Sequence, residues 1–139
     1  MPDYPWFPPG RAYDVWLKRH VVDLGVPVGI DTFAPNEKDA PSLRAWWASI
    51  VRHAFSPGGL HTSLSGLRDA GLRPKLRRIK VPTLGMNRRC DQAVRFQAGE
   101  HLAQQIPGAV WRPFEGVDYL SFYGDRGSVI EAILEFAAR

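Results

Sequence analysis

The sequence of 139 residues contains a single cysteine and four histidines. Cys90 has no second cysteine to pair with, so a disulfide within the chain is excluded. A metal site built from cysteine and histidine needs several ligands at close spacing, and the histidines are too scattered to supply them. They stand at His20, His53, His61 and His101. We therefore expect no disulfide scaffold, no metal centre and no cofactor.

Long apolar runs are also missing. No run approaches the roughly 20 residues that a membrane-spanning helix needs. The opening Met-Pro-Asp-Tyr-Pro-Trp has neither the basic start nor the apolar core of a secretory signal. With 45% hydrophobic and 23% charged residues, the chain has the composition of one folded domain. We expect a cytoplasmic protein that does not engage a membrane.

The positive charge is concentrated in one stretch. The formal net charge is +4, and residues 68–80 hold six basic side chains against the single acid Asp69. That stretch carries +5, which leaves the remainder at −1. A block of like charge can bind phosphates, but a solvated basic connector between two packed elements has the same pattern. We favour the connector and do not expect nucleic-acid binding.

The first half of the chain has the periodicity of helices. Apolar residues recur three and four positions apart over 11–24 and again over 41–54, where Pro41 suits the first turn of a helix. A weaker pattern of the same kind covers 60–67, where glycines interrupt it. We predict a helical region over residues 1–75.

The second half alternates between short apolar runs and helical patterns. Residues 81–86 form an apolar run bounded by turn residues, which is typical of a buried strand. Apolar residues spaced by four then predict a helix over 94–106, a second strand follows over 109–114, and an apolar stripe predicts a helix at the C-terminus. This order over 76–139 indicates parallel strands joined by a right-handed crossover.

Several short motifs follow one another along the chain. In the second half they are Leu76-Arg77-Arg78-Ile79-Lys80-Val81-Pro82-Thr83-Leu84, Asn87-Arg88-Arg89-Cys90-Asp91, Ile106-Pro107-Gly108 and Gly116-Val117-Asp118-Tyr119-Leu120. In order and spacing they resemble the last two β-α units of α/β-hydrolases. The elements Asp3-Tyr4-Pro5-Trp6, Phe33-Ala34-Pro35 and Ser56-Pro57-Gly58 are similar to the hydrolase-like domains associated with bacterial adenylate cyclases. The resemblance implies an α/β fold, with a helical cap followed by the β-α-β-α unit of an α/β-hydrolase-type parallel sheet that is incomplete.

The resemblance also assigns positions of the catalytic triad. The triad acid of this family lies in the loop after the penultimate strand, which is the position of Asp91. The triad histidine follows the last strand, where this sequence has Tyr119. A phenol with an ordinary pKa of about 10 does not readily replace imidazole as a general base at neutral pH. Asp91 has a structural interpretation as well, as the N-cap of a helix that starts near Ala93, and we favour it.

The nucleophile of this fold precedes the acid in the chain. The only near match to its Gly-x-Ser-x-Gly turn is Ala54-Phe55-Ser56-Pro57-Gly58. Pro57 has no N–H, so the residue after the serine cannot supply the usual oxyanion-hole donor. We reject Ser56 as a nucleophile.

Three hypotheses follow for function. The first is a catalytically inactive α/β-hydrolase-like fragment that acts as an interaction or regulatory module, pairing with itself or with a partner protein through the free edge of the 81–86 strand. The second is a serine hydrolase assembled in trans with a chain that supplies the nucleophile. The third is a module linked to cyclase signalling that binds a small apolar ligand. Trp16, Trp46 and Trp47 are candidates to line such a ligand site, although aromatic side chains of this kind are more often part of a core.

Overall fold

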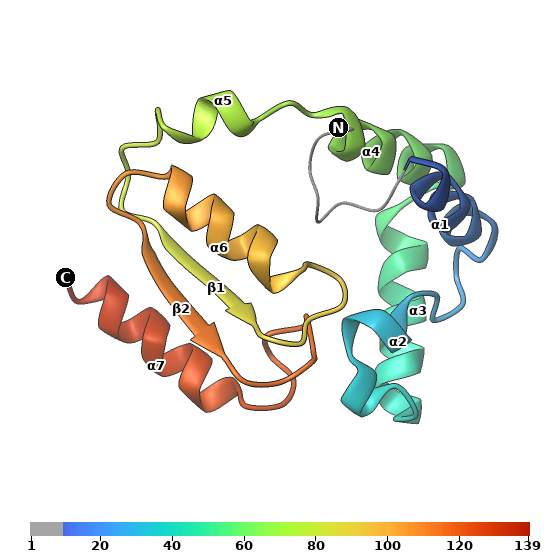
Figure 1. The fold of residues 1–139 in the computed structure, drawn as a ribbon. Coiled ribbons are helices and arrows are strands. Elements are labelled where there is room, and N and C mark those ends of the chain that lie inside the picture. The colour runs from blue at the N-terminus through green and yellow to red at the C-terminus, as the bar shows by residue number, and fades with distance from the viewer. Residues whose placement is uncertain (1–9) are drawn as a thin grey trace. The chain divides into compact units, whose positions relative to one another are not determined.

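The computed structural model describes residues 10–139, so the Asp3-Tyr4-Pro5-Trp6 motif lies outside the described residues. The elements follow in the order α1 (Gly10–Val22), α2 (Ile30–Phe33), a 3-10 turn (Pro35–Glu37), α3 (Pro41–Ala54), α4 (Pro57–Asp69), α5 (Arg73–Leu76), β1 (Leu84–Arg88), α6 (Phe96–Gln105), β2 (Val110–Phe114) and α7 (Arg126–Ala137) (Figure 1). Among residues 10–139, none of the helices has the length and apolar character needed to cross a lipid bilayer.

The chain forms two compact units. The first contains the residues up to Asp31 together with Lys38–Gly71, and the second contains Thr32–Glu37 together with Leu72–Arg139. The short segment 32–37, which the sequence places in the helical region 1–75, therefore belongs to the second unit.

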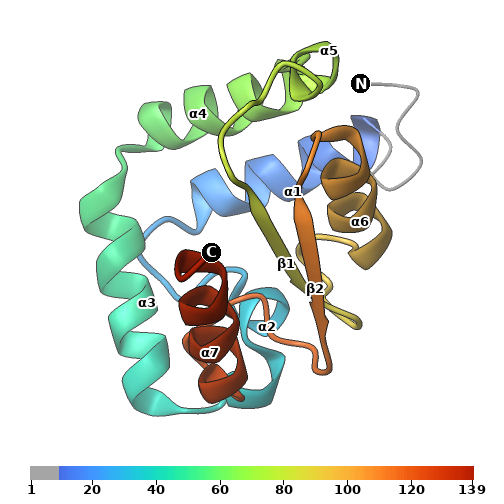
Figure 2. The same ribbon diagram turned by 90° about the vertical axis from the view of Figure 1, so that its left-hand side faces the viewer.

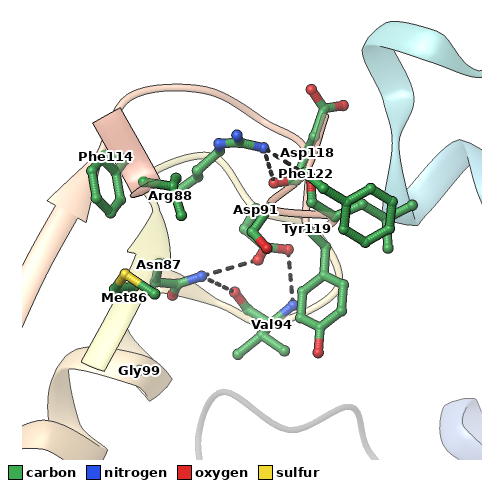
Figure 3. A pocket seen from close by; sticks show the side chains of 13 residues that line it. Met86, Asn87, Arg88, Asp91, Val94, Gly99, Phe114, Asp118, Tyr119 and Phe122 are labelled. Carbon is green, nitrogen blue, oxygen red and sulfur yellow. Dashed lines mark hydrogen bonds between the residues drawn. The ribbon is translucent and has the colours of Figure 1, made fainter. Parts of the chain in front are cut away.

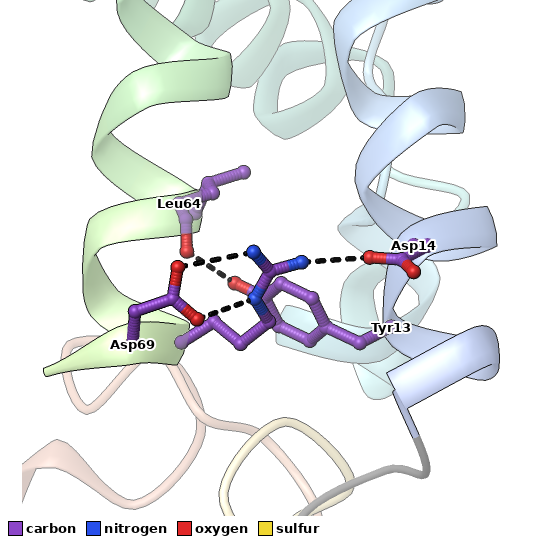
Figure 4. A network of polar contacts seen from close by, with 5 residues as sticks. Tyr13, Asp14, Leu64 and Asp69 are labelled. Carbon is purple, nitrogen blue, oxygen red and sulfur yellow. Dashed lines mark hydrogen bonds and ion pairs between the residues drawn. The ribbon is translucent and has the colours of Figure 1, made fainter. Parts of the chain in front are cut away.

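In the first unit, α1 packs against α4. The Tyr13 hydroxyl donates a hydrogen bond of 2.7 Å to the Leu64 carbonyl oxygen. The Arg68 guanidinium bridges the two helices at the surface, because it reaches Asp14 and Asp69, each at 2.8 Å (Figure 4). Ion pairs this exposed contribute little to stability, so the buried apolar side chains between the helices hold them together.

The two longer helices that follow α1 each begin with a proline. Pro41 and Pro57 stand in the first turn of α3 and α4, where a missing N–H removes no hydrogen bond of the helix. Ser56 is the N-cap of α4, and its Oγ accepts a hydrogen bond of 3.1 Å from the Gly59 N–H. The three helices predicted for this region are confirmed. Ser56 lies between two helices, so it does not occupy the strand-to-helix turn of a nucleophile.

The second unit is built on two parallel strands. Leu84 of β1 lies opposite Val110 of β2, and Arg88 lies opposite Phe114. Helix α6 makes the crossover between the strands, and α6 and α7 lie on opposite faces of the sheet in both views (Figure 1, Figure 2). The predicted β-α-β-α order and the parallel pairing are confirmed.

Helix α6 lies very close to the sheet. A Cβ atom added at Gly99 would stand 2.9 Å from both Asn87 Oδ1 and the Trp111 ring, nearer than real Cβ atoms come. Ala103, one turn further along α6, is buried with 6% of its surface exposed. Small residues on this face therefore allow the helix to rest on the Trp111 ring.

The first strand differs from its prediction. The sequence predicts a strand over 81–86, whereas β1 runs from Leu84 to Arg88 and Val81 is 67% exposed. Because β2 begins at Val110, the first residue of β1 with a partner is Leu84. Pro82 also has no N–H to offer a neighbouring strand. No residue of the apolar run 81–86 is buried, so the prediction of a buried strand over this run is wrong, and the partner strand sets where pairing begins.

His20 makes the stability of the first unit depend on pH. Its side chain is 9% exposed, Nδ1 lies 2.8 Å from the Trp16 carbonyl oxygen, and Nε2 is buried without a hydrogen-bond partner. Burial lowers the pKa of His20 below its ordinary value. As the pH falls, His20 therefore binds a proton in the unfolded chain before it does so in the folded chain. We expect the free energy of unfolding to fall as the pH drops from about 6.5 to the lower pKa of the folded state, and to be fully retained above that window.

Urea unfolding at about pH 8 and about pH 5 measures this effect. The His20→Leu variant should lose most of the difference between the two pH values, because the group that titrates is gone. His53 is exposed, so His53→Leu is the matched control and should keep the wild-type difference. An unchanged pH dependence in His20→Leu would show that other groups cause it.

Candidate functional site

A pocket of about 410 Å³ lies in the second unit, where β1 and β2 end (Figure 3). Ligands of open parallel sheets commonly bind at this end of the strands. Its walls include Met86, Phe114 and Phe122, which are apolar, together with Asp91 and Tyr119. The structure therefore brings the residue at the triad-acid position and the residue at the histidine position to one pocket.

The carboxylate of Asp91 is held by donors from its own loop. The side chain is only 5% exposed. Its Oδ1 accepts hydrogen bonds from the N–H groups of Ala93 at 2.8 Å and Val94 at 3.0 Å, and its Oδ2 accepts one from Asn87 Nδ2 at 3.0 Å (Figure 3). Both oxygens are thus engaged in closing the turn after β1.

The prediction that Asp91 caps a helix near Ala93 is wrong. Helix α6 begins at Phe96, and Arg95 is its N-cap residue without a side-chain capping bond. Asp91 instead caps the turn that precedes the helix, because aspartate side chains readily accept from backbone N–H groups two and three residues further on. The structural role expected for Asp91 is present, but it serves a turn and not a helix.

Burial raises the pKa of Asp91 above its ordinary value. Four weaker influences lower the pKa but do not outweigh the effect of burial. They are the hydrogen bonds from Val94, Ala93 and Asn87 and the positive charge of Arg88. In a working triad the acid accepts an N–H from the histidine and stabilises its charged form. Here the oxygens of Asp91 accept from an amide side chain and two backbone groups, none of which can take up a proton.

Tyr119 follows β2 and is half exposed. Its backbone N–H donates to the Phe33 carbonyl oxygen at 2.9 Å, and its ring meets the Phe33 ring edge-on at 5.6 Å between centroids. The carboxylate of the neighbouring Asp118 is buried and accepts from the Asn36 backbone N–H and from Asn36 Nδ2, each at 3.0 Å. Asp118 therefore ties the loop after β2 to segment 32–37, and Tyr119 rests against that segment.

Arg88 positions this loop, a role that the Asn87-Arg88-Arg89-Cys90-Asp91 motif did not predict. Its side chain is 6% exposed and donates hydrogen bonds to the carbonyl oxygens of Asp118 at 2.8 Å, Tyr123 at 2.6 Å and Leu120 at 3.4 Å. The period of two along β1 was the available signal, because it places Arg88 on the same face as Leu84. A basic residue at the end of a strand is expected to be exposed unless the alternation of the two strand faces is taken into account.

The three tryptophans proposed for a ligand site all belong to the first unit, and none of them is among the residues that line the pocket. Trp16 stacks on His20 at 4.0 Å between ring centroids. Trp46 and Trp47 follow each other on α3, and the Trp47 indole N–H donates to the Val28 carbonyl oxygen at 2.9 Å. The role of these residues in ligand binding remains a prediction.

Within residues 10–139, no three or more histidine, cysteine, aspartate or glutamate side chains come together closely enough to hold a metal ion.

No protein-family model matches the sequence. The AB hydrolase superfamily protein YisY of Bacillus subtilis (strain 168) is 32% identical over 101 residues, which make up 73% of this chain and 37% of that protein. The chain therefore spans little more than a third of this curated relative.

Solved structures match over nearly the whole chain. The esterase EaEST from Exiguobacterium antarcticum has a TM-score of 0.81 and 25% identity, over 100% of this chain and 52% of the esterase. The bromoperoxidase from Bacillus anthracis has a TM-score of 0.82 and 20% identity, over 99% of this chain and 52% of that chain. The chain thus corresponds to about half of each solved structure. Together these similarities show that the chain has an α/β-hydrolase-like fold and matches part of an α/β-hydrolase domain.

Proposed function

We propose that this chain is a catalytically inactive part of an α/β-hydrolase domain and that it acts as an interaction or regulatory module. The observation that carries the proposal is Tyr119. It occupies the position that the resemblance gives to the triad histidine, and the lining of the pocket that it shares with Asp91 contains no histidine. A neutral phenol is a poor general base at neutral pH.

The surroundings of Asp91 support the same proposal. Its oxygens already accept three hydrogen bonds from Asn87, Ala93 and Val94. Those bonds account for the presence of a buried carboxylate without any catalytic role. A regulatory form of the module is favoured by two sequence elements that are similar to those of domains associated with adenylate cyclases. These elements are Phe33-Ala34-Pro35 and Ser56-Pro57-Gly58.

Ester hydrolysis by the purified chain tests the proposal. We expect p-nitrophenyl esters with short and medium acyl chains to be hydrolysed at the rate of buffer alone. The Exiguobacterium antarcticum esterase, assayed under the same conditions, is the positive control. Turnover well above the buffer rate across several preparations would contradict the proposal.

A hydrolase assembled in trans is the second candidate. It is favoured by the extent of the match, because the chain corresponds to only 52% of the solved esterase. In that arrangement another polypeptide would supply the nucleophile and Asp91 would supply the acid. Tyr119 counts against it, since the assembled site would still lack the general base. Turnover that appears only when the two polypeptides are mixed, and disappears in Asp91→Asn, would favour this candidate over the first.

A further inference from the structure

A groove of about 360 Å³ lies between α1 and α4 in the first unit. Its lining residues recur three or four positions apart on each helix, so they share one face of that helix. They include Asp14, Lys18 and Val22 of α1, and His61, Ser65 and Arg68 of α4. The groove has the volume of a small-molecule site. It shares no lining residue with the pocket that contains Asp91 and Tyr119.

The charged groups at one end of the groove are already paired with each other. The Arg68 guanidinium donates to Asp14 at 2.8 Å and to the two oxygens of Asp69 at 2.8 Å and 3.0 Å (Figure 4). Two carboxylates therefore surround one guanidinium, and its positive charge is compensated. A ligand has to be held by other groups of the groove.

The remaining polar side chains of the groove are free to bind a ligand. In the part of the chain that the structure describes, the side chains of Lys18, His61 and Ser65 form no hydrogen bond or ion pair. An ammonium, an imidazole and a hydroxyl group can each donate a hydrogen bond. Lys18 lies one helical turn beyond Asp14, so a free cation stands next to the paired end of the groove.

Apolar side chains line the groove beside these donors. Leu17 is 4% exposed and lies at the base of the groove. Val21 and Val22 follow Lys18 by about one turn of α1, and Val22 is 73% exposed. The groove therefore joins a free positive charge and two further donors to an exposed apolar strip. This combination suits a molecule with an anionic head and an apolar chain.

We propose that the groove binds a small phosphate monoester that carries a short apolar chain. A phosphate group presents three strongly accepting oxygens and a charge of about −1.5 to −2 at pH 7, which matches three free donors of which one is a cation. Lysine binds phosphates as a point charge. The apolar chain lies against Val21 and Val22 and removes their surface from water. Because neither Asp91 nor Tyr119 takes part, the inference goes beyond the proposed function and does not depend on it.

Titration with octyl phosphate, followed by the amide chemical shifts of the full isotope-labelled chain, tests the proposal. Below the concentration at which octyl phosphate forms micelles, we expect saturable shifts in α1 and α4 around Lys18 and Ser65. Octanol lacks the charge and inorganic phosphate lacks the chain, so each should bind at least about tenfold more weakly. The absence of saturable shifts in α1 and α4, or shifts centred on Asp91 and Tyr119, would overturn the proposal.

A lipid headgroup offers the same phosphate chemistry in a membrane. Vesicles of equimolar phosphatidylcholine and phosphatidic acid distinguish this source from a free small molecule. We expect the chain to bind octyl phosphate and to remain unbound when mixed with the vesicles, because the groove has the volume of a small-molecule site. Binding to the vesicles without binding of octyl phosphate would overturn the proposal.

Two variants and one control define the groups that bind. Lys18→Ala removes the free cation and should weaken octyl phosphate binding by about tenfold or more. Ser65→Ala removes one donor and should weaken binding by a smaller factor, while alanine preserves the helix. Arg19→Ala is the matched control, because Arg19 is the next residue of α1, pairs with Asp23 at 3.7 Å and does not line the groove. It should bind octyl phosphate as wild type does. Equal losses in Lys18→Ala and Arg19→Ala, with folding intact by circular dichroism, would reveal unspecific charge attraction and overturn the proposal.

Discussion

Replacing Asp91 with alanine should lower the free energy of unfolding by about 3 kcal/mol or more. The substitution leaves the N–H groups of Ala93 and Val94 and the Asn87 side-chain amide without their acceptor. The Asn87 amide is buried and the two N–H groups are partly buried, and an unsatisfied buried donor costs about 1–3 kcal/mol. Equilibrium urea unfolding, followed by circular dichroism, measures the loss.

Glu115→Ala is the matched control for this measurement. Glu115 is an exposed carboxylate paired with Arg89 at 3.0 Å, and losing such a pair should change stability by less than about 1 kcal/mol. An Asp91→Ala variant as stable as wild type, or more stable, would contradict the structural role. Residues retained only for catalysis often show that behaviour, because active sites trade stability for function.

Replacing Arg88 with alanine should cost a similar amount, about 3 kcal/mol or more, and should loosen the loop that carries Tyr119. The guanidinium is buried and donates to the carbonyl oxygens of Asp118, Leu120 and Tyr123. Without it, three carbonyl groups lose a charged donor and a cavity remains beside β1. The loss is measured by urea unfolding, and the loosening by faster amide exchange at residues 118–123.

Arg89→Ala, at the adjacent position, is the matched control for Arg88→Ala. Arg89 is half exposed and pairs with the exposed Glu115, so its loss should be small. Arg88→Lys should fall between wild type and alanine, because one ammonium group does not reproduce the planar fork of donors. Equal unfolding free energies for the Arg88→Ala and Arg89→Ala variants would show that the buried contacts do not hold the loop.

Local signals were enough to predict most of the secondary structure. Pro41 marks a helix start because proline fits the first turn, and the apolar periodicity after it sets the helix face. The third helix was predicted only from Leu60 onward, whereas it begins at Pro57. The parallel pairing also followed from the order strand, helix, strand, helix. The start of β1 was misplaced because strand limits depend on the partner strand, which local sequence does not reveal.

The candidate site was harder to predict, because its contacts join residues that are distant in sequence. Asn36 and Asp118 are 82 positions apart, and no local pattern indicates that they bond. No local pattern indicates that Arg88 is buried, because its burial depends on carbonyl acceptors that the loop after β2 supplies. Asp91 was identified by resemblance alone, and only its hydrogen bonds distinguish a turn cap from a helix cap.

The central claim is that Tyr119 and Asp91 do not form a working catalytic pair. The most direct test is the rate of p-nitrophenyl acetate hydrolysis by the wild-type chain beside Tyr119→Phe, which keeps the ring and removes the hydroxyl group. We expect both proteins to hydrolyse the ester at the rate of buffer alone. A wild-type rate above buffer that Tyr119→Phe abolishes, with folding intact, would contradict it.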